Sequence, residues 1–214
     1  MKKLLLVALV SVAEWTGISA VAQEKTPASK QVDTVSKQNI SEKNDVMKQL
    51  LAFSAPGKQH LLLADLAGTW AFQDQKLAFV KGKIVRKQVY DGRFFIVEIT
   101  GGKLQVPVGG GMMKEENYQS MQIEGYDNPK AKFVTISINN HIGSDIEMQT
   151  GTYDTKTKVI TYDWDTELIP GVRTKNRLLL RILDKDHYSE EFFEIRNDVP
   201  VKVRELDYTR VSEG

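Results

Sequence analysis

Three histidines are the first residues to weigh for chemistry, because the chain of 214 residues contains no cysteine. His60, His141 and His187 lie far apart, and none belongs to an H-x-x-x-H pair. A zinc site needs three or four converging ligands. His187 could serve as a single axial haem ligand, but nothing else in the sequence supports haem binding. We therefore interpret the histidines as unrelated surface or rim residues and predict no metal and no cofactor.

Paired carboxylates occur at three places: Glu115–Glu116, Asp163 with Asp165, and Glu190–Glu191. Adjacent residues of a strand point to opposite faces, so Glu190 and Glu191 cannot share a site. Asp163 and Asp165 share a face and could bind a cation or transfer protons. Since charged side chains are mostly exposed, we favour a solvent-facing position for both. The sequence also lacks a G-x-S-x-G elbow, and no catalytic residue is predicted.

The segment Gly101 to Asn117, GGKLQVPVGGGMMKEEN, is too rich in glycine for a central strand. We predict a long mobile loop at one rim of the fold. Its three consecutive glycines lack the spacing and the following helix of a phosphate-binding loop, so nucleotide binding is not expected.

The predicted secondary structure, which must position any site, changes from helix to strand at Gly68. Before it, NDVMKQLLAF has apolar residues at helical spacing after Asn44, and Ser54 to Leu66 is predicted as a second short helix, so residues 44–67 form a helical segment. After it, apolar residues alternate with polar ones, and turn signals separate the runs. The predicted strands are Thr69–Phe72, Leu77–Val80, Lys83–Tyr90, Phe94–Thr100, Tyr118–Gly125, Phe133–Asn139, Asp145–Tyr153, Val159–Trp164, Lys175–Leu183, His187–Ile195 and Val201–Tyr208.

About ten strands with short connections and no intervening helix predict an all-β, antiparallel domain over residues 68–212. A closed barrel leaves no exposed sheet edge, and we favour it over a sandwich.

The start of the chain has the form of a signal peptide over residues 1–22, with Lys2 and Lys3, an apolar run from Leu4 to Ala13, and a predicted cut after Ala22. Residues 23–43 are polar and aperiodic, and we interpret them as a flexible tether. Together with the missing acylation cysteine, these features predict an exported bacterial protein, periplasmic or secreted.

The charge and hydropathy of the chain exclude two classes of partner. The formal net charge is +1, and removal of the signal peptide with Lys2, Lys3 and Glu14 brings it to zero. A neutral chain without a basic block is not expected to bind nucleic acid. No apolar run is long enough for a membrane span.

Alternation along the strands suggests a lumen with apolar walls, although it leaves open which face of each strand points inward. Small barrels of this size are either filled with side chains or hold one small ligand. Methionine would give adaptable walls, and a few polar groups would orient the ligand. The candidate ligand-binding residues in the lumen or at its mouth are Arg93, Phe95, Met121, Tyr126, Ile136, Met148, Tyr162 and Trp164.

Several short motifs occur in a recognisable order: Pro56-Gly57-Lys58-Gln59-His60, LADLAGTW, DGRFF, EGYDNPKAKFV, GTYD and LDYTR. On these motifs the chain resembles the bacterial domain-of-unknown-function family 1579 over residues 54 to 210. The resemblance implies a lipocalin-like (calycin-like) fold, and it implies no activity or ligand. The Trp-x-Asp step of the family is replaced here by Ile138 to His141, and the segment Gly109 to Asn117 is longer and more polar. If these positions contact a ligand in the family, the ligand of this member differs.

The resemblance also implies a role for Gly68-Thr69-Trp70. In lipocalin-like barrels a Gly-x-Trp step begins the first strand, the indole plugs the closed end, and a basic side chain of the last strand packs across it. Here Gly68, Trp70 and Arg210 would form this closure.

Our leading hypothesis is a non-enzymatic, exported barrel that binds a small apolar or amphipathic ligand. The first alternative is a hydrolase or isomerase with its site at the barrel mouth, which would show converging polar residues with shifted pKa values. The second is an envelope protein-interaction domain, which would show a contiguous exposed apolar patch. The sequence leaves the oligomeric state open.

Overall fold

The computed structural model describes residues 43–211. The chain divides into two compact units, Met1–Val46 and Met47–Gly214. Residues 43–46 of the first unit are helical, and the helix continues to residue 54. The predicted signal peptide lies outside the described residues, as does the predicted tether except for its last residue.

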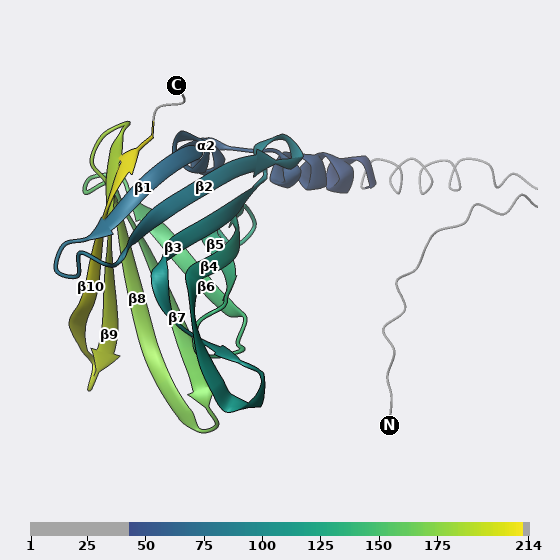
Figure 1. The fold of residues 1–214 in the computed structure, drawn as a ribbon. Helices are drawn as coiled ribbons and strands as arrows, with labels where there is room; N and C mark the ends of the chain where they lie inside the picture. The colour runs from purple at the N-terminus through teal and green to yellow at the C-terminus, as the bar shows by residue number, and fades with distance from the viewer. Residues whose placement is uncertain (1–42, 212–214) are drawn as a thin grey trace, which may run out of the picture. The chain divides into compact units, whose positions relative to one another are not determined.

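Ten strands form one closed antiparallel barrel in the second unit (Figure 1). Each strand pairs with its neighbour along the chain, and β1 pairs with β10 to close the ring. The strands are β1 (Gly68–Asp74), β2 (Lys81–Val89), β3 (Phe94–Val108), β4 (Met112–Asp127), β5 (Lys132–Asn139), β6 (Glu147–Asp154), β7 (Val159–Ile169), β8 (Val172–Ile182), β9 (His187–Arg196) and β10 (Val199–Arg210). The predicted all-β barrel is confirmed.

Helix α2 (Lys58–Asp65) lies across the end of the barrel at which β1 begins (Figure 1). Leu63 is 1% exposed and Leu66, just after the helix, is 3% exposed, and both belong to the core. The predicted second helix therefore exists, but it begins at Lys58 and not at Ser54.

The predicted strand Leu77–Val80 is wrong, because these residues form the turn between β1 and β2. Asp74 Oδ1 accepts hydrogen bonds from the backbone N–H groups of Lys76 at 2.8 Å and Leu77 at 2.9 Å. The Val80 N–H donates to the Leu77 carbonyl at 2.8 Å. An aspartate that satisfies two following amides stabilises a turn, and this local preference outweighs the apolar alternation.

The predicted rim loop Gly101 to Asn117 is also wrong. The β3 and β4 strands continue through it, and the short 3-10 segment η2 (Gly109–Gly111) forms the turn between them. Gly110 and Gly111 have φ angles of 75° and 74°, which explains the glycines as turn residues. The pairing of β3 with β2 ends at Gly101, and that of β4 with β5 begins at Ser120. The outer part of the hairpin is therefore a two-stranded ribbon.

Candidate functional site

The end of the barrel next to α2 is built from the motif that precedes β1. The Gly57 N–H donates to His60 Nδ1 at 3.0 Å, which satisfies an amide in front of the helix. His60 is 4% exposed, and its ring packs edge-on against Tyr126 with centroids 5.8 Å apart. Burial lowers the pKa of His60. The Pro-Gly-x-x-His sequence is therefore a helix-starting motif and not a metal ligand set.

Trp70 and Arg210 make the contact that the resemblance implied. The Arg210 guanidinium carbon lies 4.1 Å from the centroid of the Trp70 ring. Arg210 also donates to the carbonyls of Ala67 at 2.7 Å and Asp65 at 2.6 Å, and Trp70 Nε1 donates to the Leu66 carbonyl at 2.9 Å. These bonds satisfy carbonyls at the end of α2 and fasten the helix to the first and last strands.

Gly68 is part of the same closure for a steric reason. Its φ angle is +113°, and an added Cβ would meet Arg210 Nη1 at 2.9 Å. A larger residue at this position would push the guanidinium away from Trp70.

Aromatic rings continue from Trp70 towards the centre of the barrel. Trp70 packs edge-on against Tyr188, with centroids 4.7 Å apart, and Tyr188 stacks on Tyr208 at 4.1 Å. The Tyr208 hydroxyl donates to Glu190 Oε2 at 2.6 Å. The row of rings Trp70, Tyr188 and Tyr208 therefore ends at a half-buried carboxylate.

A cavity of about 50 Å³ lies within the barrel, next to this carboxylate. The apolar side chains of its lining are Leu63, Leu66, Ile84, Ile99, Leu178, Leu180 and Phe192. The polar side chains of the lining, here called the polar wall, are Arg86, Gln122, Glu124, Thr135, Gln149, Tyr162 and Glu190, of which Glu190 lies directly opposite the apolar Leu180. One water requires roughly 10–15 Å³ of such volume, so the space fits a few waters or a molecule of a few non-hydrogen atoms.

Arg86 and Glu124 form a bidentate ion pair in the polar wall. Arg86 Nε lies 2.8 Å from Glu124 Oε2, and Nη2 lies 3.0 Å from Oε1. The side chains are only 2% and 8% exposed. Arg86 Nη1 also donates to the Leu66 carbonyl at 3.1 Å. Burial disfavours the charge of Arg86, but the charge and hydrogen bonds of Glu124, together with Tyr188 and Glu190, outweigh burial and raise the pKa of Arg86.

Glu190 is the second carboxylate of the polar wall. Burial raises its pKa from 4.5 to about 7, although the hydrogen bond from Tyr208 and the charge of Arg86 oppose the shift. Because Glu124 already neutralises Arg86, an ionised Glu190 adds a negative charge to the cavity wall. Glu190 therefore changes its charge near neutral pH, in a site with hydrogen-bond donors around it.

The ligand-binding residues predicted from sequence fall into three groups by their position in the structure, and Ile136 belongs to two of these groups. Tyr162 lines the cavity and is 4% exposed, and burial raises the pKa of its hydroxyl. Phe95 is fully buried in the core. Trp164 borders a separate hollow of about 310 Å³ with Asn176 and Ile195, and its buried Nε1 has no hydrogen-bond partner among the described residues.

A second group lies around a surface groove of about 400 Å³ instead of the lumen. Arg93, Tyr126 and Ile136 all border it, together with Phe53 and Phe94. The EGYDNP motif forms one side of this groove. Gly125 is required there, because an added Cβ would meet the Phe94 ring at 2.9 Å.

The third group corrects the predicted lumen. Met121, Ile136 and Met148 are 46%, 37% and 62% exposed and lie on the outer face. Their neighbours Gln122, Thr135 and Gln149 point inward and line the cavity. At these positions of β4, β5 and β6 the apolar residues therefore face outward and the polar residues face the lumen, whereas Phe133 at the start of β5 is buried in the core.

Arg86, Glu124 and Glu190 were missed as site residues, although two signals pointed to them. Arg86 has the same strand phase as Ile84, which is 3% exposed, so a charged residue shares a buried face. Glu124 begins the EGYDNP motif. The pairing of Arg86 with Glu124 joins residues 38 positions apart and is not visible from local sequence.

The other candidates for chemistry are dispersed. His187 is exposed and its Nδ1 lies 2.9 Å from Asp184 Oδ1, whereas Asp163 pairs with Arg177 at 2.7 Å on the outer face. Over residues 43–211 no group of three or more histidine and carboxylate side chains is placed to hold a metal ion. Within the same range, no helix is both long and apolar enough for a bilayer crossing.

The model of one protein family matches residues 55–210 of the chain. That family is described as "Protein of unknown function (DUF1579)". No curated protein matches the chain.

Proposed function

The chain belongs to the domain-of-unknown-function family 1579, and from this premise we propose that it is an exported, non-enzymatic barrel that binds one small amphipathic molecule in its lumen. The observation that carries the proposal is a single cavity lined by both apolar and polar side chains. Ligand sites combine apolar lining with a few placed polar groups, and this cavity has both.

The volume limits the size of the ligand. Sites for drug-sized molecules have roughly 300–1,000 Å³, whereas this cavity has about 50 Å³. The proposed ligand therefore has only a few non-hydrogen atoms within the lumen. Its apolar side would contact Leu178 and Leu180, and its polar side would face Glu190 and Gln149.

The charges in the wall favour a ligand that donates hydrogen bonds. Glu124 is occupied by Arg86, so Glu190 is the carboxylate that can accept a further bond. A cationic or amide-like head would stabilise the ionised form of Glu190, whereas an anionic head would be repelled by it. Gln122 and Gln149 can accept or donate as required.

Native mass spectrometry of the mature protein purified from its own host tests the proposal. We expect a stoichiometric adduct of low mass that denaturation releases. A Glu190→Gln variant should lose the adduct, and a matched Glu98→Gln variant on the outer face should keep it. A parent protein that carries no adduct and binds no small amine or amide in calorimetric titration would contradict the proposal.

The enzyme hypothesis keeps one specific observation in its favour, which is the pKa of Glu190. A carboxylate with a pKa of about 7 is suited to general acid–base catalysis, and Tyr162 and Arg86 lie in the same wall. The segment Gly101 to Asn117 cannot serve as its rim loop, because it is a β-ribbon. Turnover of the released ligand, lost in Glu190→Gln, would favour an isomerase or hydrolase over a binding protein.

A further inference from the structure

The outer surface of the barrel carries a continuous row of aliphatic side chains across four strands. Ile96 of β3 lies opposite Ile123 of β4, which lies opposite Ile136 of β5, which in turn lies opposite Met148 of β6. A second pair, Met121 and Ile138, lies beside this row. Directly opposite residues of paired strands have Cβ atoms roughly 4.5–5.5 Å apart, so these six side chains form one surface, here called the outer aliphatic face.

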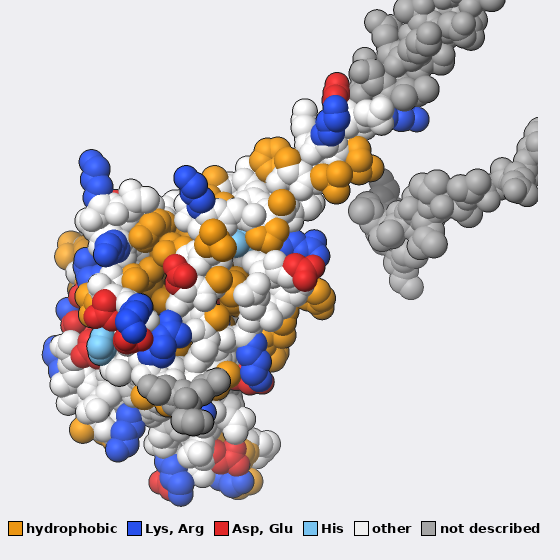
Figure 2. Space-filling view, turned by 90° about the horizontal axis from the view of Figure 1, so that it is seen from above, with side chains coloured by type: hydrophobic (Ala, Val, Ile, Leu, Met, Phe, Trp, Pro, Cys, Tyr) orange, Lys and Arg blue, Asp and Glu red, His pale blue; other side chains and the backbone are white. Residues whose placement is uncertain are grey.

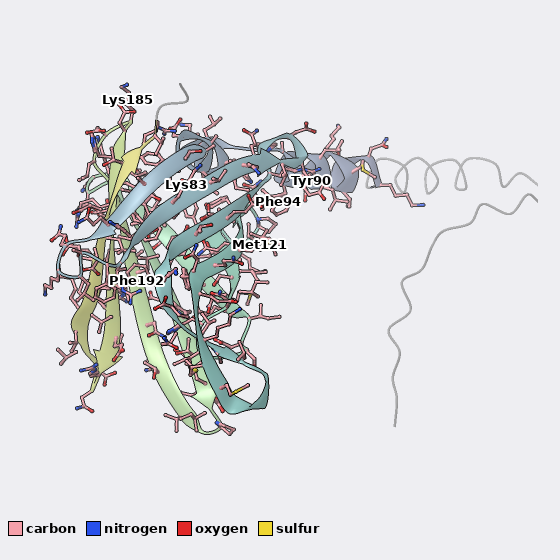
Figure 3. The ribbon with its side chains drawn as sticks, viewed as in Figure 1. Lys83, Tyr90, Phe94, Met121, Lys185 and Phe192 are labelled. Carbon is pink, nitrogen blue, oxygen red and sulfur yellow. The ribbon has the colours of Figure 1, made fainter. Side chains whose placement is uncertain are left out.

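The outer aliphatic face is exposed in the single chain. Ile123, Ile138 and Met121 are 46%, 43% and 46% exposed, and Figure 3 labels Met121 and Phe94 on this side of the barrel. An antiparallel sheet normally directs polar side chains to the solvent.

The next two strands of the ring, β7 and β8, follow that rule in their middle. On β7 and β8 the outward positions are charged, with Asp163 opposite Arg177 and Asp165 opposite Lys175. The row of opposed aliphatic side chains on β3–β6 has no counterpart at these positions, and a contiguous exposed apolar surface is typical of an interaction site.

The helix that ends at residue 54 carries a second exposed apolar surface, and hydrophobic side chains stand out along it in Figure 2. Met47, Leu50 and Leu51 have helical spacing and are 55%, 56% and 64% exposed, and Phe53 is 54% exposed. We call these four residues the helical stripe.

The end of the helical stripe is fixed next to the outer aliphatic face. Asn128 Nδ2, in the turn between β4 and β5, donates to the carbonyls of Phe53 at 2.8 Å and Ala55 at 3.0 Å. The groove of about 400 Å³ joins the two surfaces, since Phe53, Ile123 and Ile136 all border it. Within residues 43–211 both surfaces are nevertheless exposed.

We propose that the outer aliphatic face is covered by the helical stripe of a second copy of this chain, and reciprocally, in a two-fold symmetric dimer. Each copy offers one helix and one sheet face, so a single rotation covers all four apolar surfaces. The exposed Glu98, opposite Met121 at the border of the outer aliphatic face, is paired with Lys87 at 3.2 Å, and the chain as a whole has a formal net charge of only +1. Two copies therefore approach each other with little electrostatic repulsion.

The molar mass of the mature protein, measured by light scattering and by sedimentation over a wide range of concentration, tests the proposal. We expect a dimer. Ile123→Lys and Leu50→Lys should each give a folded monomer with the circular dichroism spectrum of the parent. The matched control is Val172→Lys, because Val172 is 57% exposed on β8, outside both surfaces, and this variant should stay dimeric.

A cross-linking experiment separates a second copy from other occupants. The chain has no cysteine, so Leu50→Cys and Ile123→Cys can be made as single variants with different tags and mixed. We expect a disulfide-linked product that contains both tags and that reduction separates. A parent that is monomeric at all concentrations, including one that instead binds phospholipid vesicles, would overturn the proposal. A dimer that survives either lysine substitution, or that gives no mixed product, would overturn it as well.

Discussion

The Glu124 carboxylate accepts hydrogen bonds from the Arg86 guanidinium through both of its oxygens, at 2.8 and 3.0 Å. The Arg86 and Glu124 side chains are only 2% and 8% exposed. Removal of one partner leaves the other as an uncompensated charge. We expect Glu124→Gln to lower the free energy of unfolding by about 3–5 kcal/mol, as for other broken buried pairs.

Chemical denaturation measures this loss, and the exposed pair Lys87–Glu98 provides the control. Its side chains are 63% and 58% exposed at 3.2 Å. Glu98→Gln should change the free energy of unfolding by at most about 1 kcal/mol. Equal effects of the two substitutions would show that the Arg86–Glu124 pair is well hydrated.

The stability of the protein should depend on pH through Glu190. Its pKa is raised from 4.5 to about 7, so the folded protein binds more protons than the unfolded chain between these values. The free energy of unfolding should therefore fall as pH rises from 4.5 to 7, by on the order of 1–3 kcal/mol.

The comparison of Glu190→Gln with the parent isolates this effect. His60 contributes the opposite slope, because burial lowers its pKa. Urea titrations across this pH range should show a parent-minus-variant difference that declines with pH. A difference that stays constant would place the pKa of Glu190 at its ordinary value.

Trp70→Ala should destabilise the barrel by about 3–5 kcal/mol, as expected for a large-to-small change in a core. Trp70 is 1% exposed and loses its contacts with Tyr188 and Arg210. Thermal melting checks the result against Phe79→Ala, since Phe79 is 67% exposed. A Trp70→Ala protein that melts like the parent would show that the indole does not close the barrel.

Gly82→Ala should also destabilise the fold, by about 1–3 kcal/mol or more, through overpacking. An added Cβ would lie 2.2 Å from the Thr100 carbonyl oxygen and 2.6 Å from the Phe72 ring. Gly109→Ala is the control, because no atom lies within 4 Å of its added Cβ. Denaturation midpoints of the two variants should differ clearly, and coincident midpoints would mean that β2 and β3 move apart without cost.

Export should leave a mature chain that begins at Gln23. Intact-mass analysis of the protein from the periplasm or the medium of its host measures this end directly. A chain that keeps residues 1–22 and stays in the cytoplasm would refute the prediction.

Alternation and turn signals predict the ten strands of the barrel and one further strand, Leu77–Val80, that does not exist, and the closed barrel follows from the need to leave no exposed sheet edge. Alternation does not tell which face of β4, β5 and β6 points into the barrel. The usual assignment puts Met121, Ile136 and Met148 inside, whereas Glu124 points inward to meet Arg86 from another strand. Which polar side chains line the lumen depends on such pairs between residues that are far apart in the sequence. The Gly109–Gly111 turn differs from the predicted long loop because three consecutive glycines are equally compatible with one tight turn between two long strands.

Because Trp70 of β1 pairs with Arg210 of β10, the barrel can close only after the last strand has been synthesised. Because non-local pairing delays folding, the nascent polypeptide remains an open, unsealed sheet for nearly the whole of its synthesis. A chain that ends before β10 would keep two unpaired strand edges, which can pair with other chains.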